Sequence, residues 1–192
     1  MIRCVGEPSS RFSEDALRIL RGMRFASRFG FRIEEKTANA MHGLRERLKS
    51  IAAERIRVEL EGVLVGGGAM SVLREYTDVL SVVIPEIRPC IGFDQLNPVH
   101  PYDVWEHTLH SIDCIEPEPI LRWTMLMHDL GKPSCFSRKG EGRRGHFYGH
   151  GRVSAEMAEK IMRRLRFSRG EESLIRELVY THDRYLKPDA RS

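Results

Sequence analysis

Apolar residues recur at helical spacing along most of the 192-residue chain, and the alternation typical of half-buried strands is nearly absent. The pattern therefore predicts an all-α protein. A first helix is expected to begin after Ser13, a good N-cap residue, and to run to about Phe29, where Gly30 supplies the stop. Further helices are predicted over about 34–48, 51–64, 69–79, 103–115, 119–130, 152–166 and 170–184.

Two stretches interrupt the helical pattern, from Pro85 to Pro101 and from Ser137 to Gly151. The glycine run at residues 66–68 closes one predicted helix and is the best candidate for a domain boundary.

Charge is distributed unevenly along the chain. The net charge is +4, but residues 1–60 carry +5, residues 61–120 carry −8 and residues 121–192 carry +7. Two basic blocks around an acidic one are typical of a protein that contacts phosphates, although ordinary solvated helix faces would give the same counts.

Composition points to a soluble, cytoplasmic protein with no membrane partner. The uncharged stretch 63–73 is far shorter than the about 20 apolar residues of a bilayer crossing. The first residues lead into polar sequence, so no secretory signal is expected. The four cysteines lie far apart without a CxxC pair, which favours reduced thiols over a disulfide or zinc framework.

The first predicted helix carries an arginine face. On a helical wheel, one arc of about 120° holds four arginines, while apolar residues occupy the opposite side: Arg18, Arg21, Arg24 and Arg28 against Ile19, Met23 and Ala26. Guanidinium groups donate in a planar fork, which suits phosphates and base edges. A solvated arginine face without a ligand is the alternative.

Asp15 and Arg18 are three residues apart and would share one side of this helix. A carboxylate accepts from an exocyclic amine and a guanidinium donates to a ring nitrogen or carbonyl, so the pair matches cytosine and adenine edges. Taken alone, the same spacing also fits a surface salt bridge.

The C-terminal half concentrates histidines and aspartates in a pattern that predicts a metal site: His107, His128-Asp129 and His182-Asp183, with His146 and His150 between them. Mixed imidazole and carboxylate ligands suit Mn, Fe, Co, Ni or Zn and leave positions for water and a phosphoryl oxygen. Such a site supports phosphoester hydrolysis, with His128 and Asp129 as its catalytic pair. His110 competes with His107 as a ligand, and Lys132 either holds a phosphate or meets the dipole of a helix end.

These motifs together resemble a known family. Residues 2–6, 11–21 and 24–25 resemble the neck of class II tRNA nucleotidyltransferases, the CCA-adding enzymes, and of bacterial poly(A) polymerases. Residues 53–60 resemble the next neck motif of these enzymes, and 107–183 resemble the HD domain that many of them carry. The resemblance covers nearly all of the chain.

The resemblance implies a helical neck over 1–65, a helical connection over 66–100 and an HD domain over 101–192. In the neck it implies that Asp15 and Arg18 pair with the base of incoming CTP or ATP and that Glu14 orients Arg18. Glu54 and Arg55 would brace the neck helices, and tRNA would be the partner of the face with Arg21, Arg24 and Arg28.

For the HD domain, the resemblance implies a divalent metal, Ni, Co, Mn or Fe, and a phosphohydrolase activity that includes 2′,3′-cyclic phosphates. The implied ligands are His107, His128, Asp129 and Asp183, with His150 and His182 available to a second ion.

Family members begin with a nucleotidyltransferase head whose carboxylates hold Mg²⁺, and nothing similar precedes Met1. We therefore expect that this chain alone adds no nucleotides and that it is a fragment of a longer protein, or else a truncated gene product. Two other hypotheses remain open, a free-standing HD phosphohydrolase and a non-catalytic RNA-binding module.

Overall fold

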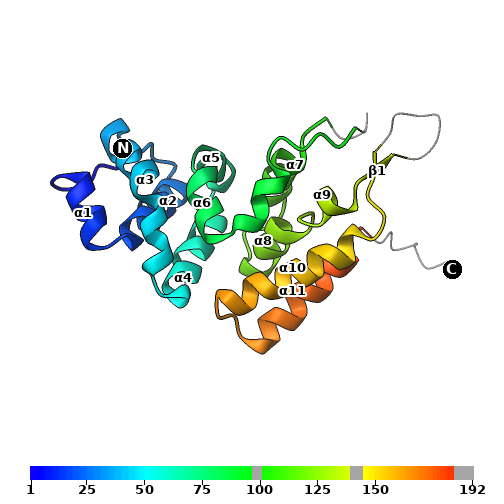
Figure 1. Ribbon diagram of the computed structural model, residues 1–192. Coiled ribbons are helices and arrows are strands. Elements are labelled where there is room, and N and C mark those ends of the chain that lie inside the picture. The colour runs from blue at the N-terminus through cyan, green and yellow to red at the C-terminus, as the bar shows by residue number, and fades with distance from the viewer. Residues whose placement is uncertain (97–100, 139–144, 184–192) are drawn as a thin grey trace.

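The computed structural model of the protein describes residues 1–96, 101–138 and 145–183. Within them the chain forms eleven α-helices, two 3-10 helices and one two-stranded antiparallel hairpin. Figure 1 shows an elongated arrangement in which α1–α6 form one end and α7–α11 the other. The prediction of an all-α fold is confirmed, with the small hairpin as an addition.

The first part of the chain contains α1 (Pro8–Glu14), α2 (Leu17–Phe29), α3 (Glu35–Leu44), η1 (Arg45–Ser50), α4 (Ala53–Leu64), α5 (Ala69–Glu75), α6 (Thr77–Val83) and η2 (Pro85–Cys90). The second part contains α7 (Val104–Cys114), α8 (Pro119–Met127), α9 (Lys132–Cys135), β1 (Ser137–Arg138), β2 (Gly145–His146), α10 (His150–Arg164) and α11 (Arg169–Thr181). In the described residues no helix combines the length and the apolar character needed to cross a membrane.

The predicted first helix is wrong in its start. Ser13 lies inside α1, whose first turn contains Pro8, and the chain breaks at Asp15 before α2 begins. Asp15 adopts an extended conformation, and its Oδ1 accepts a hydrogen bond of 3.0 Å from the backbone N–H of Leu17. The predicted stop is confirmed, because Gly30 ends α2 with a φ of 65°.

Two other predicted helices are shorter than expected. The helix predicted over 34–48 ends as α3 at Leu44 and continues as the 3-10 helix η1. The helix predicted over 69–79 is divided into α5 and α6 at Tyr76, whose ring is buried and stacks on His42 at 4.9 Å.

The glycine run at 66–68 forms a packing seam and not an exposed linker. A Cβ on Gly66 would lie 2.2 Å from Ser27 Oγ and 2.7 Å from the Ser27 carbonyl carbon. The N–H of Gly68 donates to the Ser27 carbonyl at 2.8 Å. Only glycine allows the chain to approach α2 this closely, so α5 begins against the last turn of α2, at Ser27.

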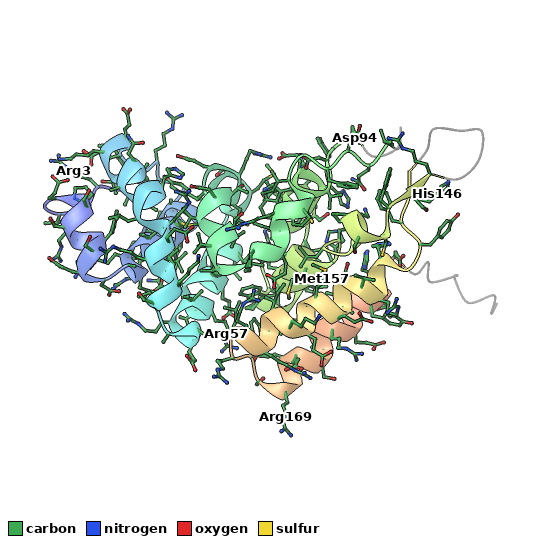
Figure 2. All side chains as sticks on the ribbon, viewed as in Figure 1. Arg3, Arg57, Asp94, His146, Met157 and Arg169 are labelled. Atoms are coloured by element: carbon green, nitrogen blue, oxygen red, sulfur yellow. The ribbon has the colours of Figure 1, made fainter. Side chains whose placement is uncertain are left out.

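The two parts of the molecule are joined by a charged and aromatic contact. Arg57 of α4 donates to Glu171 of α11 at 3.0 Å, and its guanidinium lies 4.8 Å from the ring centroid of Phe167. Trp123, which is fully buried, meets Phe167 edge-on at 5.1 Å. Figure 2 labels Arg57 where α4 faces the α10–α11 hairpin.

Candidate metal centre and nucleotide-recognition motif

Asp129 lies at the centre of a histidine cluster where four helices meet. It follows the end of α8, and His107 reaches it from α7. Because α10 and α11 pack as an antiparallel pair, the first residue of α10, His150, and the C-cap of α11, His182, arrive on the same side (Figure 1).

Each oxygen of the Asp129 carboxylate faces two imidazoles. Oδ2 lies 3.4 Å from His107 Nε2 and 3.0 Å from His128 Nε2. Oδ1 lies 3.3 Å from His150 Nε2 and 3.4 Å from His182 Nε2. The result is two ligand groups that share one carboxylate, one with His107 and His128 and one with His150 and His182.

Backbone carbonyls orient three of these rings. In each, Nδ1 lies 2.7 or 2.8 Å from the carbonyl oxygen three residues earlier: His128 to Met125, His150 to Phe147 and His182 to Val179. A carbonyl only accepts, so Nδ1 carries the proton and the neutral ring presents the lone pair of Nε2 to the centre. Metal-ligating histidines are held in this way.

The cluster fits a divalent cation. The Nε2 atoms of His150 and His182 lie 3.2 Å apart, although the neutral rings are both acceptors there. Neither oxygen of Asp129 accepts a well-aligned hydrogen bond, although the side chain is buried. The Nε2 atoms of His150 and His182 and Oδ1 of Asp129 thus converge without a donor between them. Their nitrogen and carboxylate chemistry is that of Mn, Fe, Co, Ni and Zn sites.

The electrostatic environment of the cluster favours an ionised Asp129 carboxylate with positive charge beside it. Burial by itself would raise the pKa of Asp129, but the surrounding imidazoles of His128, His150 and His182 outweigh it and hold this pKa well below its usual range. Burial opposes protonation of His182, yet its contact with Asp129 raises the pKa of the imidazole.

Lys132 is the only lysine near this centre in the described residues. Its Nζ lies 2.7 Å from Asp129 Oδ2 and donates to Gln95 Oε1 at 2.9 Å. Lys132 and Gln95 are both buried, and they line a cavity of about 740 Å³ together with the histidine cluster. A volume of this size is in the range of about 300–1,000 Å³ typical of small-ligand sites.

The second site predicted from sequence lies in the first part of the molecule. Arg18 Nη1 donates to Glu14 Oε2 and to the carbonyl of Arg11, both at 2.9 Å. Hydrogen bonding from Arg18 holds the pKa of Glu14 below its usual value. Asp15 Oδ2 lies 3.3 Å from Arg55 of α4. Arg55 therefore orients the Asp15 carboxylate, as Glu14 orients the Arg18 guanidinium.

The expectation that Asp15 and Arg18 share one side of a single helix is wrong, because Asp15 lies in the extended link before α2. A cavity of about 280 Å³ opens beside Arg18 and is also lined by Arg21 and Phe25.

The other arginines of α2 have different surroundings. Arg24 Nε lies 3.2 Å from the buried carboxylate of Glu59, and Arg21 Nε lies 4.0 Å from it. Arg28 is exposed and lies over the exposed ring of Phe29 at 5.9 Å.

Two stretches of the chain match known family models. Residues 30–91 match the family model described as "Probable RNA and SrmB- binding site of polymerase A", and residues 100–190 match the HD domain model. The A-adding tRNA nucleotidyltransferase of Deinococcus radiodurans is 33% identical over 98% of this chain and 46% of its own length. The CC-adding tRNA nucleotidyltransferase of Thermus thermophilus is 34% identical over 88% of this chain and 42% of its own length.

The chain is thus similar to tRNA nucleotidyltransferases over most of its own length and carries the RNA-binding and HD domain models. It spans about half the length of the curated relatives that it matches.

The structure brings together five of the six predicted metal ligands. Asp183 is the exception, because its side chain is 53% exposed, lies 4.0 Å from His150 Nε2 and stands outside both ligand groups. His110 stacks on Tyr102 at 4.2 Å and turns toward Glu106, so His107 and not His110 contacts Asp129.

The sequence analysis named Lys132 but did not predict its two partners, Asp129 and Gln95. Lys132 follows Asp129 by three residues, and this spacing was a usable signal for an ion pair at the end of α8. Gln95 carried no signal, since it lies 37 residues from Lys132 in sequence and meets it only in the folded chain.

Proposed function

We propose that this chain is the nucleotide-selecting and tRNA-binding part of a tRNA nucleotidyltransferase. The observation that carries the proposal is the pre-oriented set of Glu14, Asp15 and Arg18, of which Arg18 lines a small cavity. Arg18 offers donors that Glu14 and the Arg11 carbonyl hold in place, and Asp15 offers an acceptor that Arg55 holds. Donors and acceptors fixed in advance discriminate CTP and ATP bases at little entropic cost.

tRNA is the proposed macromolecular partner. Residues 1–60 carry a net charge of +5, and Arg21 and Arg28 are exposed on α2. Arg24 also belongs to the proposed RNA-contacting face, but its contact with Glu59 gives it a second task in holding α2 against α4. Phosphate contacts of this kind predict binding that weakens steeply as salt rises.

The test is nucleotide addition to tRNA lacking its 3′ end, by a protein that carries this neck together with a nucleotidyltransferase head and its Mg²⁺. Arg18→Ala should abolish addition or scramble the choice between CTP and ATP. Arg28→Ala, the matched control, should weaken tRNA binding while the choice of nucleotide is kept. Normal selectivity in Arg18→Ala would refute the templating role.

A second function is supported by the metal centre. We propose that the HD domain is a metal-dependent phosphohydrolase in which His107, His128, Asp129, His150 and His182 hold one or two divalent ions. A divalent ion held there would polarise a phosphoryl oxygen and would lower the pKa of its bound water toward neutrality. Asp183 would join the ligands only after a rotation of its exposed side chain.

Lys132 adds a basic group to this site. Its Nζ is a buried cation held by Gln95 at the wall of the same cavity, so it is placed to bind a phosphate oxygen. In hydrolysis of a 2′,3′-cyclic phosphate, water adds to phosphorus, one P–O bond breaks and a phosphomonoester with a free hydroxyl remains.

The test is incubation of the purified chain with a 2′,3′-cyclic nucleotide and added Ni²⁺, Co²⁺ or Mn²⁺. Hydrolysis that Asp129→Asn abolishes and Asp183→Asn retains in part would support the assignment. Absence of hydrolysis with every metal would refute it and leave this domain as a scaffold.

A further inference from the structure

An aromatic pair stands at the rim of the metal-centre cavity. The rings of His146 and Tyr148 lie parallel, with centroids 5.3 Å apart and planes inclined by only 5°. Tyr148 is 74% exposed, a large fraction for an aromatic side chain. Both residues line the cavity that contains Asp129 and Lys132. Figure 2 labels His146 at the hairpin end of the molecule.

Phe147, the residue between them, anchors this pair. Its centroid lies 5.6 Å from that of Phe136 and 6.5 Å from that of Phe93. The Phe147 ring also lines the cavity, where Lys132 Nζ lies 5.5 Å from its centroid, so the segment that carries the stacked pair is held against the candidate metal centre.

Two glycines fix this segment relative to the metal centre. A Cβ on Gly145 would lie 2.4 Å from the carbonyl oxygen of Gln95, so only glycine lets the strand close onto the residue that holds Lys132. Gly149 has a φ of 76° and turns the chain directly from Tyr148 into His150 at the start of α10. The aromatic pair is thereby tied to a phosphate-binding lysine and to a metal ligand.

This arrangement fits a ligand with a phosphate at one end and a flat ring at the other. Aromatic side chains that protein packing leaves exposed are the platforms on which unpaired bases stack, and stacking tolerates every base because each has a π-face. We propose that Tyr148, backed by His146, is a base-stacking platform, so that the centre takes nucleoside phosphates or RNA 3′ ends in preference to phosphates without a base. The inference rests on the proposed phosphohydrolase site and names its substrate class.

The experiment measures equilibrium binding of two matched ligands to the Mn²⁺-loaded chain by calorimetry. Adenosine 5′-monophosphate and ribose 5-phosphate share the sugar and the phosphate and differ in the base. The wild-type chain should bind the nucleotide about tenfold more tightly, in line with the contribution of one stacked base. Tyr148→Ala should erase this preference without weakening ribose 5-phosphate, and Tyr148→Phe should keep it.

Equal affinity of the wild-type chain for both ligands, or a preference that survives in Tyr148→Ala, would overturn the platform. The Mn²⁺ content of each variant shows that the centre itself is intact, and the exposure of Tyr148 makes its replacement a mild one for folding. Hydrolysis of 2′,3′-cyclic AMP in the same samples tests the proposed function separately. If the nucleotide is preferred through Tyr148 but cyclic AMP is not hydrolysed, the platform stands and the proposed phosphohydrolase is refuted. If cyclic AMP is hydrolysed but the nucleotide is not preferred, the phosphohydrolase stands and the platform is refuted.

Discussion

Gly131→Ala is the sharpest test of how the fold positions the metal centre. Gly131 lies between Asp129 and α9, with φ −80° and ψ −13°, a conformation that alanine adopts without strain. Its N–H donates to Ser154 Oγ at 2.9 Å, which holds the end of α8 against the start of α10. The substitution therefore isolates the effect of one added methyl group.

The methyl group has no room. It would lie 2.7 Å from the carbonyl oxygen of His150, 2.8 Å from the backbone nitrogen of Ser154 and 2.9 Å from Val153 Cβ. Because backbone atoms are the obstacle, the first turn of α10 must move. Overpacking of this kind costs about 1–3 kcal/mol of unfolding free energy. For a chain of this size, 2 kcal/mol corresponds to a decrease of roughly 4–8 °C in melting temperature.

The same movement displaces His150, so affinity for Mn²⁺ should fall about 10- to 100-fold, as it does when the support of a ligand is lost. Thermal unfolding of the metal-free chain and calorimetric titration with Mn²⁺ measure the two effects.

Gly170→Ala is the matched control. Gly170 lies in the first turn of α11, and an added Cβ there meets no atom within 4 Å. It should stabilise the chain by about 0.4–1 kcal/mol because alanine restricts the unfolded state, with no change in metal affinity. A Gly131→Ala variant that melts and binds Mn²⁺ like the wild-type chain would refute this account of the centre.

Three further predictions follow from individual contacts. Asp129→Asn should lose both ions in a calorimetric titration because the two ligand groups share this carboxylate, whereas the exposed Asp183→Asn should keep at least one; full occupancy in Asp129→Asn would contradict the shared role. Arg24→Met should lower the free energy of unfolding in urea by about 1–3 kcal/mol, because it removes the nearest partner of the buried Glu59 carboxylate. Glu171→Gln should lower the melting temperature at pH 6, and its difference from the wild type should shrink as pH falls, since the Ser168 hydrogen bond lowers the folded pKa of Glu171 below its usual value.

The sign of this last effect follows from linkage. A carboxyl whose pKa is lower in the folded state stabilises the protein above its unfolded pKa, and this contribution is lost as pH falls through the folded pKa. A gap between the two melting temperatures that stays constant from pH 6 to pH 3 would exclude this capping interaction as its source.

Local signals in the sequence determined most of the helices. The helical spacing of apolar residues located α4 and α7 within two residues of their observed ends, and Gly30 ended α2 as expected. The histidine and aspartate motifs named the five residues that converge at the candidate metal centre, because residue types and short spacings carry that chemistry, although Asp183 lies outside both ligand groups. The break at Asp15 escaped notice, since a side-chain bond to the Leu17 N–H competes with helix continuation there.

Tertiary structure alone decided which groups meet. Asp129 bridges both ligand groups because α10 and α11 pack antiparallel and bring His150 and His182 to one end. Arg24 turned to Glu59, 35 residues away in sequence, although its place on the helical wheel assigned it to a ligand-binding face. Periodicity fixes which side of a helix a residue occupies, but the partner on that side is set by the packing of distant segments, which no local pattern encodes.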